Sequence, residues 1–344
     1  MFCRAGELGQ HCLYQYPICI STRCDQNLTG AAMRAGDRGE QLMTDPIPAW
    51  PGELVGELFV RSAPAVAGAE PALFVHGLGG SSLNWTDLMA QLPPSLACEA
   101  LDLPGFGFSP LPAARNYSIT AHAAAVIALI DKRGRWPVHL VGNSLGGAIC
   151  TRVAGRRPDL VRTLTLISPA LPDLRPRLLP MRMILLCIPG LGPALMKSIQ
   201  RLPAADRSWR TIKDVYADPG LMHELRRSAE AAELARRDDL GYASEVLLGS
   251  ARGLVAEYLR GGPGSLWRDA ARVTAPALII HGSHDRLVNP AMAARAARAF
   301  RNGRVVVLPR IGHVAMMERP EAVAAEMRAM LSTTWPAAVP GRVR

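Results

Sequence analysis

The segment Val138-His-Leu-Val-Gly-Asn-Ser-Leu-Gly-Gly147 determines the fold that we expect for this chain. Its first four residues are mostly apolar and predict a short buried strand. Gly142-Asn-Ser-Leu-Gly146 follows directly and matches the pattern G-x-S-x-G, and residues 148–154 predict a helix. A strand, a tight turn and a helix are the context in which this pattern exposes a serine hydroxyl at the end of a sheet. The segment therefore predicts that Ser144 is a nucleophile.

The residues around this serine have steric and electrostatic roles. Gly142 and Gly146 lie where the strand and the helix must pass close to each other, and a residue without a Cβ suits such an approach. Leu145 opens the predicted helix, so its backbone N–H has no partner within that helix. An unpaired donor beside the nucleophile suits a developing oxyanion.

Short apolar stretches alternate with helical ones on both sides of this segment. Strands are predicted at residues 53–61 (a strand or a hairpin), 72–76, 96–101, 161–167, 277–281 and 304–308, and helices at 83–92, 119–132, 290–300 and 318–331. This alternation is typical of an α/β fold whose mostly parallel sheet is flanked by helices.

The alternation is interrupted between residues 171 and 268. Helical periods and prolines predominate there and no strand is evident, so we expect a helical cap inserted after the sixth strand. The α/β core then comprises residues 46–170 and 269–335. Its two parts are expected to form one sheet beneath the cap.

The two ends of the chain differ from the rest. Residues 1–45 contain four cysteines and no sustained periodicity, and we expect them to form a poorly ordered extension. Met33 and Met43 are alternative start positions. Residues 336–344 are expected to form a frayed tail.

Composition and spacing exclude several classes of protein. The net charge is +10, but the arginines are scattered and aromatic residues are few, so we expect no nucleic-acid partner. The seven cysteines lack the close pairs of a zinc site, and the glycines at Gly77 and Gly79 lack the third glycine of a dinucleotide-binding loop. We therefore expect no metal and no cofactor. The sequence leaves the oligomeric state open.

We expect the protein in the cytoplasm, with Cys98, Cys150 and Cys187 as buried thiols. No apolar run reaches the roughly 20 residues of a membrane helix, and no leader peptide is evident. Isolated cysteines in apolar surroundings are typical of a reducing compartment.

Three side chains of complementary chemistry follow three of the predicted strands: Ser144, Asp285 and His313. An open α/β sheet places its site at the carboxyl ends of such strands. A serine hydroxyl needs a base to take its proton, and histidine suits because its pKa lies near neutrality. A carboxylate fixes the tautomer of that histidine. Asp173 is the alternative acid, and helix capping is the alternative role of Asp285.

Five stretches together resemble the α/β-hydrolase superfamily, in its cap-bearing branch, over residues 54–331. They are His76-Gly-Leu-Gly-Gly80, Asp102-Leu-Pro-Gly-Phe-Gly-Phe-Ser109, Gly142-Asn-Ser-Leu-Gly-Gly147, Gly282-Ser-His-Asp-Arg-Leu-Val-Asn-Pro290 and Gly312-His313. The resemblance implies that Ser144, Asp285 and His313 form a catalytic triad and that the amides of Leu78 and Leu145 form the oxyanion hole.

The resemblance implies a serine esterase, which cleaves a carboxylic ester through an acyl-enzyme on Ser144. The apolar, methionine-containing stretch 178–199 suits a medium acyl or lipid-like ester and, with its basic character, permits contact with a membrane surface. Two alternatives stay open. One is a carbon–carbon bond hydrolase of the same fold, whose elbow the pair Asn143-Ser144 resembles, and the other is a ligand-binding protein with little turnover.

Overall fold

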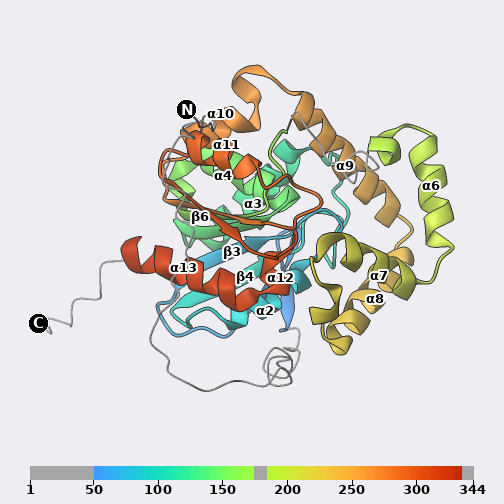
Figure 1. The fold of residues 1–344 in the computed structure, drawn as a ribbon, viewed down its shortest axis with the longest axis horizontal. Helices are drawn as coiled ribbons and strands as arrows, with labels where there is room; N and C mark the ends of the chain where they lie inside the picture. Colours follow the sequence, from blue (N-terminus) through green and yellow to red (C-terminus); the bar gives the residue numbers. More distant parts are fainter. Residues whose placement is uncertain (1–49, 174–183, 335–344) are drawn as a thin grey trace, which may run out of the picture.

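The computed structural model describes residues 50–173 and 184–334 (Figure 1). The predictions for residues 1–45 and 336–344, and for the first part of the apolar stretch 178–199, lie outside the described residues. Within the described residues, no helix has both the length and the apolar character needed to cross a bilayer.

One eight-stranded sheet forms the centre of the molecule, in the order β1-β2-β4-β3-β5-β6-β7-β8. The strands are β1 (Gly52–Val55), β2 (Leu58–Ser62), β3 (Glu70–Val75), β4 (Leu96–Leu101), β5 (Val138–Asn143), β6 (Val161–Ile167), β7 (Ala277–Gly282) and β8 (Gly303–Leu308). β2 pairs antiparallel with both β1 and β4, and all other neighbours are parallel. The mostly parallel sheet that the sequence predicts is therefore confirmed.

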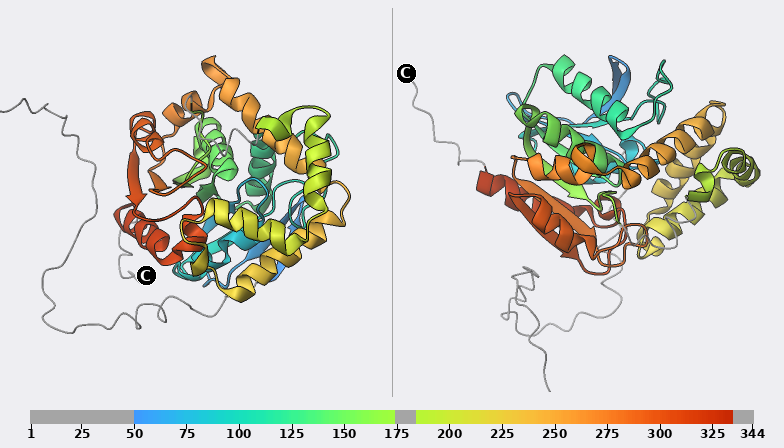
Figure 2. Two further views of the ribbon diagram at one scale, coloured as in Figure 1. Left: turned by 45° about the vertical axis from the view of Figure 1, so that its right-hand side comes forward. Right: turned by 90° about the horizontal axis from the view of Figure 1, so that it is seen from above.

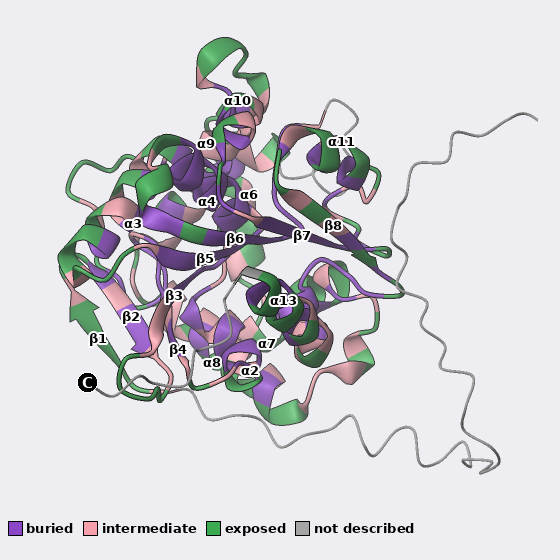
Figure 3. Ribbon diagram, turned by 90° about the vertical axis from the view of Figure 1, so that its left-hand side faces the viewer, coloured by how far each residue is buried: buried purple, intermediate pink, exposed green. Residues whose placement is uncertain are grey.

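Helices cover both faces of this sheet, as Figure 3 shows. On one face lie α3 (Ile119–Arg133), α4 (Leu145–Arg156), α10 (Leu266–Arg272) and α11 (Met292–Ala299); on the other lie α2 (Thr86–Ala90), α12 (Ala315–Glu318) and α13 (Pro320–Thr334). Because both faces are covered, every residue of β5 and of β7 is buried.

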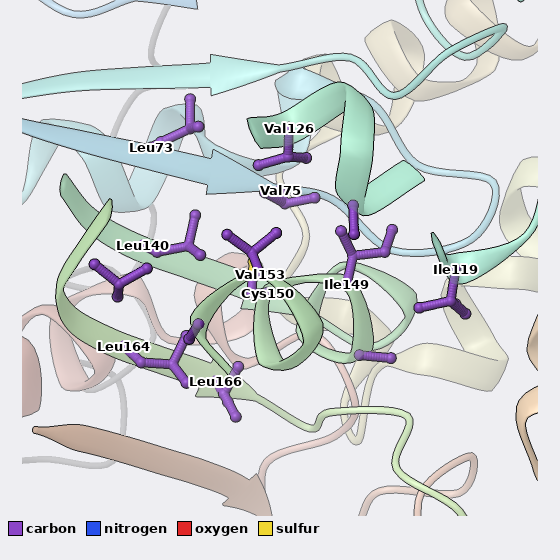
Figure 4. Close-up of a cluster of buried hydrophobic side chains, with 14 of the residues drawn as sticks. Leu73, Val75, Ile119, Val126, Leu140, Ile149, Cys150, Val153, Leu164 and Leu166 are labelled. Atoms are coloured by element: carbon purple, nitrogen blue, oxygen red, sulfur yellow. The ribbon is translucent and has the colours of Figure 1, made fainter. Parts of the chain in front are cut away.

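The helix that follows Ser144, α4, is almost fully buried in the core. In Figure 4, Ile149, Cys150 and Val153 of α4 belong to a cluster of buried side chains that also contains Leu140 of β5 and Leu164 of β6. All five side chains are fully buried. The segment that carries the serine is thus held by close packing on the sheet.

The chain between β6 and β7 forms a helical cap beside the sheet (Figure 2), as the sequence predicts. Its helices are α6 (Leu191–Gln200), α7 (Ala204–Val215), α8 (Glu224–Asp238) and α9 (Ala243–Leu259), with short 3₁₀ turns at η3 (Pro219–Leu221) and η4 (Gly262–Gly264). The sequence did not predict α7. The predicted helix at 83–92 is instead a 3₁₀ turn, η1 (Ser82–Trp85), followed by the single short helix α2; one further turn, η2 (Pro158–Leu160), precedes β6.

A buried ion-pair network fastens the cap to the core at Arg152 of α4. Its guanidinium donates to both carboxylate oxygens of Glu257 on α9, at 2.7 and 2.8 Å, and to Asp269 on α10, at 2.9 Å. It also donates to Thr120 Oγ1 and to the carbonyl of Gly264. Arg152, Glu257 and Asp269 are at most 1% exposed, so Arg152 is the fully buried cation that both carboxylates share.

We predict that Arg152→Met lowers the free energy of unfolding by about 3–5 kcal/mol, because it removes the fully buried cation from two buried carboxylates. The remaining partners, Arg156, Arg260 and Arg272, are exposed arginines at 3.3–3.8 Å. The measurement is urea denaturation followed by circular dichroism. Arg157→Met is the matched control, since Arg157 pairs with Asp159 at the surface and an exposed pair contributes little to stability. Equal stability of the two variants would contradict the prediction.

Candidate active site

The turn at Ser144 is strained and sterically restricted. Ser144 has φ +52° and ψ −116°, a combination that side-chain-bearing residues rarely adopt. A Cβ placed on Gly146 would lie 2.1 Å from the carbonyl oxygen of Val75, and one on Gly142 would lie 2.6 Å from that of Gly146. The predicted need for glycine on both sides of the serine is therefore confirmed.

Two backbone segments with the predicted oxyanion donors adjoin this serine. Leu145 is the first residue of α4, so its N–H has no intrahelical acceptor. The loop after β3 lies against the turn, because a Cβ placed on Gly77 would come within 3.2 Å of Ser144 Cβ. Leu78, the second predicted donor, follows in that loop.

Asp285 and His313 are in direct contact at the ends of β7 and β8. Asp285 Oδ2 lies 2.9 Å from His313 Nδ1, while Oδ1 accepts the amides of Leu287 and Val288 at 2.8 and 2.9 Å. Burial by itself raises the pKa of Asp285, but the charge of His313 and these hydrogen bonds hold it below its usual value. An ionised Asp285 accepts the proton on Nδ1, so the lone pair of His313 lies on Nε2.

The main chain of His313 is held against the serine turn. Asn143, the last residue of β5, donates from Nδ2 to the carbonyl of His313 at 3.1 Å and to that of Ile167 at 3.0 Å. In the described residues, Ser144 Oγ makes no hydrogen bond to His313. The hydroxyl–imidazole contact thus stays a prediction, and such contacts often tighten only when substrate binds.

The alternative acid has a different neighbourhood. Asp173 lies near Tyr258 of α9, where its charge adds to the effect of burial in raising the pKa of that tyrosine to about 12. The carboxylate hydrogen-bonded to His313 is that of Asp285.

His76 and Asp102 are structural groups that shape the site. His76 Nδ1 donates to the carbonyl of Gly77 at 2.7 Å, and Nε2 accepts the amide of Leu103 at 3.0 Å. Burial lowers its pKa to about 4, so the ring is neutral. Asp102 accepts the amides of Ser82 and Phe108 at 2.6 and 2.8 Å. Together they join the loops that follow β3 and β4.

Two contacts at this edge of the sheet were not predicted, one made by the cap and one within the core. Arg237 of α8 donates to the carbonyl of Gly79 at 2.6 Å, one residue after Leu78. Glu318 of α12 accepts the amide of Gly312, next to His313, at 2.8 Å. The only sequence signal for Glu318 is an acidic residue at the end of the apolar run Val314–Met317.

The described residues contain no group of three or more His, Cys, Asp or Glu side chains arranged to hold a metal ion. The groups gathered at this edge are therefore a strained serine, a carboxylate–imidazole pair and backbone amides. Their chemistry is that of acyl transfer.

Comparison with known proteins identifies the fold family. Residues 71–320 match the family model described as the alpha/beta hydrolase fold. Among solved structures, the chain is similar to a membrane phospholipase A that is described as a bacterial virulence factor. The TM-score is 0.67 and the sequence identity is 23%, over 83% of this chain and 86% of that one. A likeness at that identity concerns the fold alone.

Three curated relatives are similar over most of this chain. A dihydrolipoyllysine-residue acetyltransferase component of the acetoin cleaving system from Cupriavidus necator is 29% identical, over 83% of this chain and 69% of its own. A pimeloyl-[acyl-carrier protein] methyl ester esterase from Neisseria meningitidis is 29% identical, over 74% and 90%. The monoacylglycerol lipase abhd6-B from Xenopus laevis is 26% identical, over 80% and 79%.

The buried histidines predict how stability depends on pH. Burial lowers the pKa of His76, His122 and His281 from 6.5 to about 4. Between these two pKa values the three histidines are protonated in the unfolded chain but not in the folded chain. The free energy of unfolding therefore falls as the pH drops from about 6.5 to about 4. Each histidine contributes on the order of 3 kcal/mol to this loss.

His281→Phe isolates one of these contributions, because neither ring nitrogen of His281 has a hydrogen-bond partner among the described residues. The measurement is the thermal unfolding midpoint at about pH 7 and about pH 5. We expect the midpoint of the variant to fall less on acidification than that of the unmodified chain. An identical fall in both proteins would contradict this assignment.

Proposed function

Because this chain belongs to the α/β-hydrolase family, we propose that it is a serine hydrolase that cleaves a carboxylic ester through an acyl-enzyme on Ser144. The observation that carries the proposal is the 2.9 Å contact between Asp285 and His313, at a loop whose main chain is bonded to the residue before Ser144. The Neisseria and Xenopus relatives are both named as ester hydrolases.

In the first proposed step, Ser144 Oγ attacks the ester carbonyl carbon while His313 Nε2 takes the hydroxyl proton. The carbonyl oxygen becomes an oxyanion, which the amides of Leu78 and Leu145 bind. Asp285 stabilises the imidazolium that forms, as the carboxylate does in such triads. The tetrahedral intermediate then collapses, the C–O bond to the alcohol breaks, and the alcohol leaves with the proton from His313.

In the second proposed step, His313 takes a proton from water, and the resulting hydroxide attacks the acyl-enzyme. The same two amides bind the second oxyanion. Collapse returns the proton to Ser144 Oγ and releases the carboxylic acid. No metal or redox group is needed for either step, since the chemistry is nucleophilic acyl transfer.

Asn143 bears on the carbon–carbon bond alternative. The pair Asn143-Ser144 motivated that alternative, but the amide of Asn143 is 2% exposed and bonded to two backbone carbonyls. Its position is explained by holding the histidine loop. Ester cleavage is therefore the better supported reaction.

An acceptor other than water would make the same acyl-enzyme a transferase. The Cupriavidus relative is named as an acetyltransferase component. Release of free acid in the absence of any added thiol or alcohol distinguishes hydrolysis from transfer. A binding protein with little turnover would release none.

We propose that the substrate is a lipid-like ester. We further propose that the cap binds an anionic membrane surface, where such a substrate is found. Five apolar side chains around α6, the α6 patch, are 39–49% exposed: Ile184, Leu185, Ile188, Leu191 and Ile199. Figure 1 places α6 at the outer margin of the molecule, beyond α9. Exposed apolar clusters of this kind are typical of interaction surfaces.

The charge around the α6 patch favours anionic lipid as the occupant. Lys197 and Arg201 are exposed beside it, and the sequence from Leu174 to Ala205 contains five cations and no Asp or Glu. A helix with apolar side chains and flanking cations binds favourably at an anionic bilayer surface, because the apolar side chains enter the interface and the cations attract the lipid headgroups. The cytoplasm remains the compartment that we expect.

The triad assignment predicts loss of turnover on Ser144→Ala. We expect hydrolysis of nitrophenyl esters of graded acyl length to fall on the order of 10⁴-fold or more. Asp285→Asn is expected to lower kcat severely, because His313 would then hold its proton on the wrong nitrogen. Asp173→Asn and Ser332→Ala are the matched controls and should keep full activity. A fluorophosphonate probe that fails to label Ser144 in the unmodified chain would favour the binding protein.

The α6 patch predicts binding to anionic vesicles. We expect the chain to float with phosphatidylglycerol vesicles and less with phosphatidylcholine vesicles, and the double variant Ile188→Asp, Leu191→Asp to lose this binding. Hydrolysis of a water-soluble ester should stay unchanged in that variant. Leu259→Asp is the control, since Leu259 is 83% exposed but lies at the end of α9. Equal flotation of the patch variant and the control would overturn the membrane assignment.

A further inference from the structure

The linker between α7 and α8 is hydrogen-bonded to the loop that carries His313. The carbonyl of Val215, the last residue of α7, accepts the amide of His313 at 2.7 Å. A Cβ placed on Gly312 would lie 2.4 Å from that carbonyl oxygen and 2.6 Å from the amide nitrogen of Ala217. The two segments thus pack backbone against backbone, with no side chain between them.

Glu318 joins these two segments a second time. Its Oε2 accepts the amides of Gly312 at 2.8 Å and Ala217 at 3.1 Å, and its Oε1 accepts the amide of Asp218 at 3.2 Å. The side chain is 5% exposed. No Lys or Arg forms an ion pair with it in the described part of the chain. The charge of this carboxylate is therefore held by backbone donors alone.

Hydrogen bonds to an ionised acceptor are stronger than those between neutral groups. Burying a carboxylate without such bonds costs free energy. Moving the α7–α8 linker away would break the Val215–His313 bond and leave Glu318 with one donor. Separating the linker from the histidine loop would therefore cost several hydrogen bonds at once. Figure 1 shows α7 and α8 beside α12, the short helix that ends at Glu318.

We propose that Glu318 is a positioning residue for His313. By binding the α7–α8 linker to the histidine loop, Glu318 lets the packing of the cap on the core place the imidazole next to Ser144. The proposal rests on the proposed function for the role of His313. Three groups then fix that histidine: Asp285 holds the ring, Asn143 holds the carbonyl, and the cap linker holds the amide. Glu318 in turn fastens the linker.

The same helical pair also reaches the predicted oxyanion loop. Arg237 of α8 donates to the carbonyl of Gly79 at 2.6 Å, and the loop containing Leu78 lies against Ser144. One part of the cap therefore contacts both loops on which acyl transfer depends. An error of about 1 Å in the position of a reacting group can lower a rate on the order of 100-fold.

Glu318→Gln is the central test. Glutamine fills the same space, but its NH₂ group cannot accept a backbone amide, so at least one of the three bonds is lost. We expect kcat for a water-soluble ester to fall roughly 10–100-fold with little change in KM, because the reacting groups and not the binding surface are displaced. Fluorophosphonate labelling of Ser144 should slow by the same factor. Glu318→Asp, which keeps the charge, should recover part of the loss.

Glu321→Gln is the matched control, since Glu321 is exposed on the helix that follows. Binding of an uncleaved ester to the Ser144→Ala chain, with and without Glu318→Gln, separates positioning from damage to the fold. Unchanged binding with slowed labelling supports the proposal. Unchanged labelling in a folded Glu318→Gln chain, or equal losses of labelling, ester binding and thermal stability, overturns it.

Labelling also keeps this inference separate from the proposed function. A chain whose Ser144 reacts with the probe but which cleaves no ester refutes ester hydrolysis. The labelling rates of the Glu318 variants still decide whether the residue positions His313. The two proposals therefore fail by different measurements.

Discussion

The close approach of α4 to the ends of β3 and β5 is the constraint on which the site depends. A helix can begin this near a strand only where Gly142 and Gly146 leave room for backbone oxygens. The turn between them forces Ser144 to a positive φ, which costs on the order of 1–3 kcal/mol. The amide and the carbonyl of Ser144 offset this cost, through bonds to Ile167, Ala148 and Ala170 at 2.9–3.1 Å. These bonds fix the backbone of the turn that carries the Ser144 hydroxyl and, one residue later, the amide of Leu145.

The loops around this turn are held by buried side chains that bind backbone groups. His76 and Asp102 join the loops after β3 and β4, Asn143 joins the elbow to the histidine loop, and Glu318 joins that loop to the cap. Such bonds are directional, and each fixes one peptide relative to another. Apolar packing alone would tolerate small displacements of these loops. The polar groups buried at this edge of the sheet therefore explain how irregular segments keep a defined geometry.

The sequence predicted the sheet better than it predicted the cap. The boundaries 96–101 and 161–167 coincide with β4 and β6, because short apolar runs between turn residues have few alternatives. The predicted helix at 83–92 is shorter because Ser81 caps a 3₁₀ turn first. Helix α7 was missed because most of its residues are polar: only Arg207, Ser208 and Ile212 are buried along it, so its apolar face is narrow.

The candidate site shows the same division between local pattern and tertiary contact. The motifs predicted which residues stand at the strand ends, and the structure brings Asp285 and His313 together there. No local pattern relates Glu318 to Ala217, since 101 positions separate them and the contact exists only once the cap has folded back. Residues that act through the main chain of a distant segment leave no period or spacing to recognise. They require the fold itself.

The inner and outer sides of the cap differ in the forces they use. Toward the core, Arg152, Arg237 and Glu318 make ion pairs or hydrogen bonds that specify where α9, α8 and the α7–α8 linker lie. Away from the core, the α6 patch exposes aliphatic side chains that take no part in this attachment. A cap held by directional bonds does not need apolar side chains on its far side for stability. The apolar surface of α6 is thus available for the membrane contact that we propose, while the inner side of the cap contacts the loops of the candidate site.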